Sequence, residues 1–122
     1  CYAIYMAGLV YQWLIDLGGL EAMKERNLAK ALLLYNYLDS QDYYLAPVKA
    51  GSRSMMNVTF VTGDAGLDKT FVAEAEKAGL KNLKGHRSVG GMRASIYNAM
   101  PYEGVEKLVA FMKDFAAANP KT

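Results

Sequence analysis

The apolar residues of this 122-residue sequence change their spacing along the chain, and this change restricts the folds that the chain can adopt. In residues 2–17 and 20–38 they recur near the three- and four-residue steps of a helix. Residues 53–61 are rich in the β-branched and aromatic side chains of a core strand, and residues 92–97 alternate apolar and polar. The sequence therefore predicts both helices and strands within one chain.

Glycines and capping residues predict where the helices end. Gly18 and Gly19 separate the first two helices, which predicts a helical hairpin. Asp68 is a candidate N-cap of a third helix, which we expect to continue to about Ala78 and to end at Gly79.

Lys30 falls on the charged side of the second helix together with three other charged residues, namely Glu21, Lys24 and Glu25.

The remaining segments complete a small mixed fold. A short extended piece is expected at 43–48, interrupted by Pro47, and a last amphipathic helix carries a stripe formed by Val105, Leu108, Val109, Met112 and Phe115. This order predicts an α+β fold in which helices cover one face of a small, mostly antiparallel sheet. With 52% apolar residues, the whole of 1–122 is expected to form one domain with a core of its own.

Composition limits the classes of partner and the compartment. The formal net charge of +2 is too small for an electrostatic footprint on nucleic acid or on an anionic membrane. The apolar run at the start of the chain stops at Gln12, short of the roughly 20 residues that span a bilayer, and predicts a buried or half-buried helix. One cysteine and no signal peptide indicate a reduced, cytoplasmic protein. Because the sequence lacks an initiator Met and a first N-cap, we expect it to be part of a longer protein.

The stretch KGHRSVGGMRASIYN, residues 84–98, carries more positive charge than a simple turn requires. The alternation after the glycines places Arg93 on the face of a strand opposite the core. His86 and Arg87 precede Gly90-Gly91, and a glycine pair with positive φ can fold the chain back so that the three cations converge.

This group of cations can bind two kinds of anion. A His beside an Arg can surround a phosphate dianion, and an Arg on a strand presents its planar fork to a carboxylate. From spacing alone, a solvated turn with solvated strand ends remains an alternative. A metal site is not indicated, because His86 is the only histidine and no cysteine or carboxylate cluster has ligand spacing. No acidic residue is placed to orient His86 for nucleophilic catalysis.

The run GHRSVGGMRASIYNAMPYEGVEKLVAFM at 85–112 resembles the C-terminal signature of the phosphoserine aminotransferases, pyridoxal-phosphate enzymes of serine biosynthesis. The segments YAIYMAGLVYQWL, GGLEAMKERNLAKALLLYNYLD and SRSMMNVTF are also similar to this family and occur in the same order. The resemblance covers nearly the whole chain, and implies the C-terminal small domain of a fold-type I aminotransferase, without the large cofactor-binding domain.

The resemblance implies a role for each cation. His86 and Arg87 help to bind the phosphate of O-phosphoserine, in a pocket completed by basic residues elsewhere in a homodimer, and Arg93 binds the α-carboxylate. Glutamate and 2-oxoglutarate use the same cations in the second half-reaction. The implied reaction transfers the amino group between O-phospho-L-serine with 2-oxoglutarate and 3-phosphohydroxypyruvate with L-glutamate.

The resemblance also implies what this sequence lacks. None of its lysines falls in the family's Schiff-base motif, so we expect pyridoxal 5′-phosphate to bind only in the full-length enzyme. The sequence offers no catalytic residue, and the chain alone is expected to be inactive. Two alternatives stay open: the small domain of another fold-type I aminotransferase, and a stand-alone anion-binding module without catalysis.

Overall fold

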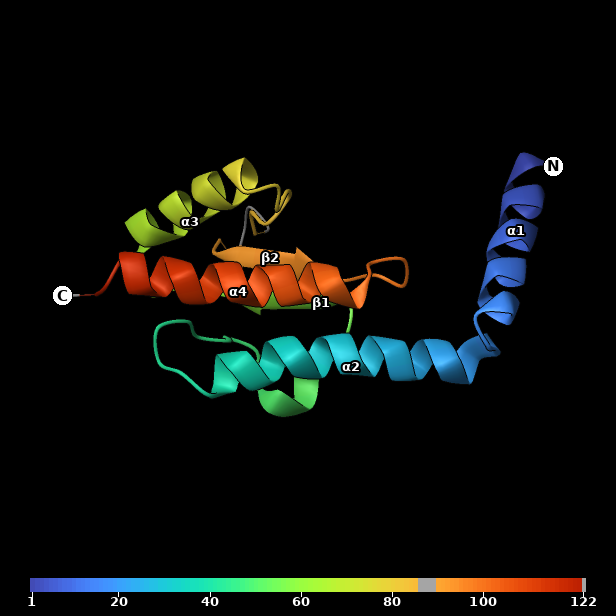
Figure 1. The fold of residues 1–122 in the computed structure, drawn as a ribbon, viewed down its shortest axis with the longest axis horizontal. Coiled ribbons are helices and arrows are strands. Elements are labelled where there is room, and N and C mark those ends of the chain that lie inside the picture. Colours follow the sequence, from blue (N-terminus) through green and yellow to red (C-terminus); the bar gives the residue numbers. More distant parts are fainter. Residues whose placement is uncertain (86–89, 122) are drawn as a thin grey trace.

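The computed structural model describes residues 1–85 and 90–121 and consists of helices around a two-stranded sheet (Figure 1). The elements are α1 (Tyr2–Asp16), α2 (Gly19–Asp39), the 3₁₀ turn η1 (Ala50–Ser52), β1 (Asn57–Phe60), α3 (Ala65–Lys77), β2 (Met92–Ser95) and α4 (Tyr102–Ala118). This is the predicted α+β fold with an antiparallel sheet.

Strands β1 and β2 pair antiparallel and give the sheet two different faces. Residues at alternate positions are fully buried on one face and half-buried on the other, because successive side chains of a strand point to opposite sides. The cross-strand pairs of the buried face are Val58 with Ala94 and Phe60 with Met92; those of the polar face are Asn57 with Ser95 and Thr59 with Arg93.

Outside these strands the chain forms only single bridges within the described residues. Leu45 pairs with Val61, and Lys84 pairs with Met92. The extended segment predicted at 43–48 was therefore too long, since Pro47 has no N–H to continue the hydrogen-bond ladder of a sheet.

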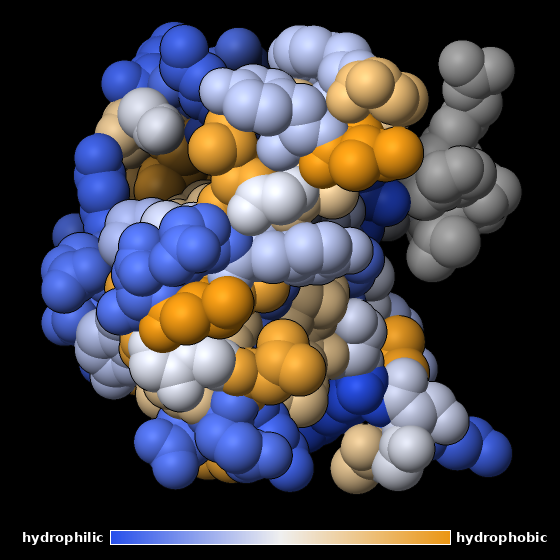
Figure 2. Space-filling model, turned by 90° about the vertical axis from the view of Figure 1, so that its right-hand side faces the viewer, coloured by the Kyte–Doolittle hydropathy of each residue, from blue (hydrophilic) through white to orange (hydrophobic). Residues whose placement is uncertain are grey.

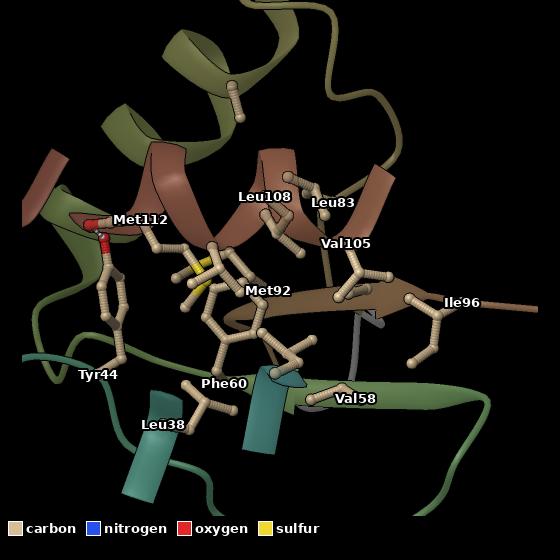
Figure 3. Close-up of a cluster of buried hydrophobic side chains, with 14 of the residues drawn as sticks. Leu38, Tyr44, Val58, Phe60, Leu83, Met92, Ile96, Val105, Leu108 and Met112 are labelled. Carbon is tan, nitrogen blue, oxygen red and sulfur yellow. Dashed lines mark hydrogen bonds between the residues drawn. The ribbon is translucent and has the colours of Figure 1, made fainter. Parts of the chain in front are cut away.

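The core lies between the buried face of the sheet and the helices α2, α3 and α4, with α4 lying along the sheet (Figures 1 and 3). At its centre, the ring of Phe71 from α3 meets the rings of Phe60, Tyr44 and Phe115 nearly edge-on, at centroid distances of 5.1–5.7 Å. Such edge-to-face pairs stabilise beyond simple area burial. The predicted α4 stripe is confirmed, because all five of its members are buried.

The N-cap of helix α3 lies four residues earlier than predicted. Its N-cap is Asp64, whose side chain accepts hydrogen bonds from the backbone N–H groups of Gly66 and Leu67. Asp68, the predicted cap, lies in the first turn and accepts from the N–H and the hydroxyl of Thr62 at 2.9 and 2.7 Å. Both residues suit a cap, so composition alone did not separate them.

Helix α1 does not form the predicted hairpin with α2, and it has no buried residue. The two helix axes bend by 79° at Gly18 and Gly19, both of which have positive φ. As a result α1 projects away from the core (Figure 1). Its apolar residues are exposed, as for Ile4 at 75% and Ile15 at 65%, and hydrophobic residues lie on the surface at this end of the molecule (Figure 2). Within the described ranges, no single helix is long and apolar enough to cross a membrane, although α1 and α2 taken together as a bent pair pass that test.

The buried Tyr44 makes stability sensitive to alkaline pH. Its hydroxyl donates to the carbonyl of Met112 at 2.8 Å, and burial raises its pKa above the usual 10. At pH 7 we expect Tyr44→Phe to lower the free energy of unfolding by about 1 kcal/mol, the net value of one hydrogen bond. Above pH 10 only the unfolded tyrosine ionises, so the native protein loses about 1.4 kcal/mol per pH unit and the variant lacks this loss.

Denaturant unfolding at pH 7 and pH 11 measures both effects. The difference between the two proteins is expected to disappear near pH 11. Tyr5→Phe, at an exposed position on α1, is the control that removes a tyrosine without removing a buried hydroxyl. A difference that stays constant from pH 7 to pH 11 would contradict the assigned role of Tyr44.

Candidate functional site

Strand β2 presents Arg93 on the polar face of the sheet. Its neighbours Met92 and Ala94 are 1% and 2% exposed in the core, so the strand cannot rotate without burying the guanidinium. Thr59 lies directly opposite Arg93 on β1. The predicted orientation of Arg93 is therefore confirmed: its half-buried side chain lies on the side of the sheet opposite the core.

The glycine pair before β2 folds the chain back as predicted. Gly90 and Gly91 have φ values of 74° and 67°. The N–H of Gly85 donates to the carbonyl of Gly91 at 2.9 Å, and the N–H of Arg93 donates to the carbonyl of Leu83 at 2.8 Å. Residues 83–85 and 91–93 therefore lie side by side.

Gly91 also needs its small size. A Cβ at this position would lie 2.5 Å from Cγ1 of Val61 and 3.0 Å from the carbonyl oxygen of Phe60. The other two predicted cations, His86 and Arg87, lie outside the described residues. They follow Gly85 directly in the sequence, and their roles stay predictions.

A small polar network that the sequence did not reveal lies beside Arg93. The side-chain oxygen Oδ1 of Asn57 accepts hydrogen bonds from the hydroxyls of Ser95 at 3.2 Å and Tyr97 at 3.3 Å. Asn57 and Ser95 are a cross-strand pair, and Tyr97 follows β2. The available signal was the polar residue at each alternate position of both strands, which marks a shared face but not its hydrogen bonds.

Lys30 anchors the chain that follows β2. Its side chain is fully buried, and its Nζ donates to the backbone carbonyls of Tyr97 and Met100 at 2.8 and 2.9 Å and, at 3.4 Å, to that of Ile96. Burial, followed by the charge of Arg26, lowers the pKa of this amine. The prediction that groups Lys30 with the charged residues on the side of the helix opposite its apolar residues was wrong, because the side chain is buried and its charge is satisfied by three carbonyls rather than by water.

One turn earlier on α2, Asn27 extends this anchor. Its amide Nδ2 donates to the side-chain oxygen of Asn98 at 2.8 Å. Lys30 and Asn27 together hold residues 96–100 against α2. They therefore fix the exit of the strand that carries Arg93.

A second anchor on α2 fixes the position of the chain where it enters β1. Arg53 forms a two-pronged ion pair with Asp39 at 2.7 and 2.8 Å, and its guanidinium lies 4.7 Å from the ring centre of Tyr35. The hydrogen bond with Arg53 lowers the pKa of Asp39. The hydroxyl of Ser54 then accepts from the N–H of Asn57 at 3.1 Å. Both strands are thus positioned from α2 before they reach the polar face.

The chemistry available on this face is anion binding. An open, mostly apolar hollow of about 480 Å³ adjoins it, between α1 and the chain around the sheet, lined by Val10, Trp13, Met56, Tyr97, Asn98 and Ala99. In the part of the chain that the structure describes, no group of three or more His, Cys, Asp or Glu side chains could hold a metal ion.

Comparison with known proteins assigns the chain to a class of enzyme. The aminotransferase class-V family matches residues 1–108. This match covers most of the chain, so the chain belongs to the aminotransferase class-V family.

Within this class, the chain is similar to phosphoserine aminotransferases. It is 57% identical to that of Listeria monocytogenes over 118 residues, which are 97% of this chain and 32% of the relative. It is 60% identical to that of a Janthinobacterium species over 114 residues, 93% of this chain and 31% of the relative. The chain therefore spans about a third of the length of these curated relatives.

Solved structures agree with the sequence comparison. The phosphoserine aminotransferase of Bacillus circulans subsp. alkalophilus superimposes with a TM-score of 0.93 at 47% identity, over 96% of this chain and 33% of that one. The enzyme of Trichomonas vaginalis, described as bound to pyridoxal phosphate, gives a TM-score of 0.85 at 41% identity, over 92% and 32%. The predicted fold-type I architecture and the resemblance to this family are therefore confirmed.

The anchor role of Lys30 can be tested through stability. Lys30→Met keeps the length of the side chain but leaves buried carbonyls without their donor, so we expect the free energy of unfolding to fall by about 2–3 kcal/mol. Lys24→Met, at an exposed position on the same helix, should change it by less than about 0.5 kcal/mol. Denaturant titration followed by circular dichroism measures both, and equal losses would argue against an anchor.

Proposed function

We propose that this chain is the C-terminal small domain of a phosphoserine aminotransferase and supplies half of its substrate site. The observation that carries the proposal is the pairing of residues 83–85 with 91–93 beside Arg93 on the polar face, in a chain similar along nearly its whole length to enzymes of this name. In the full-length enzyme, the reaction moves an amino group from O-phospho-L-serine to 2-oxoglutarate, giving 3-phosphohydroxypyruvate and L-glutamate.

The proposed ligand of Arg93 is the α-carboxylate of the substrate. A guanidinium donates two parallel hydrogen bonds to a carboxylate, and the strand holds the fork in one orientation. All four reactants carry this carboxylate, so Arg93 serves both half-reactions. His86 and Arg87 are proposed to bind the phosphate, the second anionic group of the phosphorylated pair.

The residues of this chain do not fit a cofactor site. A Schiff-base lysine needs an amine that the cofactor can reach and that its surroundings desolvate, whereas the amine of Lys30 is buried against backbone carbonyls and the remaining lysines are exposed to solvent. We therefore infer that pyridoxal 5′-phosphate, which supplies the electron sink of transamination, is held by other parts of the full-length enzyme. The chain alone is expected to be inactive, and turnover by the purified chain would contradict this.

The missing parts have a candidate docking surface in α1. This helix carries one charged residue, Asp16, while its apolar and aromatic side chains lie exposed along its length. Exposed apolar surface of this extent marks an interaction site. The relatives are three times as long as this chain, so we infer that the rest of the full-length polypeptide covers α1. Assembly as a cytoplasmic homodimer without nucleic-acid or membrane partners is part of the same proposal.

The first test uses the complete reading frame with pyridoxal phosphate, following glutamate formation from O-phosphoserine or serine with 2-oxoglutarate. A strong preference for O-phosphoserine is expected. Arg93→Ala should lower kcat/KM in both half-reactions by about 100-fold or more, from the loss of a charge-assisted pair of hydrogen bonds. His86→Ala and Arg87→Ala should raise KM mainly for the phosphorylated substrates.

Three outcomes would redirect the proposal. Use of serine and O-phosphoserine at equal rates would favour the small domain of another aminotransferase. No reaction with any amino acid would favour an anion-binding module. Equal losses for every substrate in all three variants would assign these residues to folding.

The α1 surface gives a separate prediction. In the 122-residue chain, Ile4→Ser should change the free energy of unfolding by less than about 0.5 kcal/mol, because the side chain is exposed. In the full-length enzyme it should cost about 1.5–3 kcal/mol, the value of a buried isoleucine. Denaturant unfolding of both proteins measures the contrast, with Thr70→Ala, on the exposed side of α3, as the control. A small effect in both proteins would leave α1 uncovered.

A further inference from the structure

Asn57 has a side chain whose two ends are used differently. Its oxygen Oδ1 accepts from both Ser95 and Tyr97, which occupies the two lone pairs of an amide carbonyl. Its nitrogen Nδ2 carries two N–H groups, and no acceptor in residues 1–85 or 90–121 takes a hydrogen bond from it. The side chain is half-buried, so these N–H groups remain accessible from outside the protein.

The orientation of this amide is held from two directions. Ser95 lies directly across the sheet, and Tyr97 has its backbone carbonyl fixed by the ammonium of Lys30 while its hydroxyl reaches Asn57. The backbone N–H of Asn57 is bound to the hydroxyl of Ser54. With Oδ1 directed at the two hydroxyls, the N–H groups of Nδ2 face away from them.

Asn57 and Arg93 are diagonal neighbours on the polar face. Asn57 pairs with Ser95, and Arg93 lies two residues earlier on the same strand. Diagonal positions of an antiparallel pair are about 7–8 Å apart, within reach of long side chains. A carboxylate bound by the guanidinium can therefore also come within reach of the amide of Asn57.

We propose that Asn57 is a second binding residue for the substrate carboxylate, with its Nδ2 donating a hydrogen bond to the group that Arg93 binds. The inference rests on the proposed function, which makes the α-carboxylate the ligand of Arg93. A carboxylate offers about four acceptor positions, and a guanidinium fork fills two of them. The amide fills a third from the side and fixes the rotation of the carboxylate about its own axis.

The test compares ligands with and without a carboxylate in the full-length enzyme. Asn57→Ala should raise KM for O-phosphoserine and for glutamate about tenfold, the loss of one hydrogen bond to a charged group. Asn57→Asp places a negative charge against the substrate and should raise both about 100-fold or more. O-Phosphoethanolamine has the phosphate and the amine but no carboxylate, so its inhibition constant should stay unchanged in both variants.

The controls separate binding from folding. Asn119→Ala makes the same change at the end of α4, away from the sheet, and should leave all constants unchanged. If Asn57→Ala lowers the yield of folded enzyme, Asn57→Ser is used instead. A rise in the ratio of the KM for O-phosphoserine to the inhibition constant of O-phosphoethanolamine then supports the role of Asn57 in binding. An unchanged KM for O-phosphoserine, or an equal loss for both ligands, overturns the role of Asn57 alone. A wild-type enzyme that does not use O-phosphoserine overturns the proposed function and this inference with it.

Discussion

The pairing of β1 with β2 is the interaction on which both the core and the polar face depend. Two strands of four residues each are too few to be stable alone, and they persist because Val58, Phe60, Met92 and Ala94 are buried beneath the helices. The same pairing points Arg93 the other way. A slip of one residue would exchange the two faces and place a guanidinium against the phenylalanine cluster, so the packing of the core also specifies the register of the site.

Helix α2 supplies the second level of support through charged groups used in two different ways. Arg53 and Asp39 form a partly exposed, two-pronged ion pair that fixes where the chain enters β1. Lys30 is buried, so its desolvation is costly, and three carbonyls offset that cost. The result is a pair of short strands held by a single helix at the end of the sheet where β1 begins and β2 ends.

Sequence periodicity was enough to predict the elements and the face of Arg93, because burial on one side of a strand imposes a period of two and the glycine pair permits the fold-back. It did not predict the position of α1. That helix has the composition of a core helix, and its sequence does not show which residues would cover its apolar surface. Lys30 was misplaced for a related reason, since a helical wheel separates charged from apolar residues but does not show carbonyls that arrive from residues 96–100. Asn57 requires the register of two strands far apart in sequence, which local patterns do not contain.

The alternation along β2 places neighbouring residues under two different evolutionary constraints, one from core packing and one from ligand binding. Changes at Met92 or Ala94 are limited by the volume of a packed interior, whereas Arg93 and Ser95 are only half-buried and are limited less. Ligand preference can therefore drift on one side of the strand while the other side keeps the scaffold intact. A two-stranded sheet of this kind is a natural place for related enzymes to diverge in the acids that they accept, and for protein engineers to alter selectivity without first rebuilding the fold.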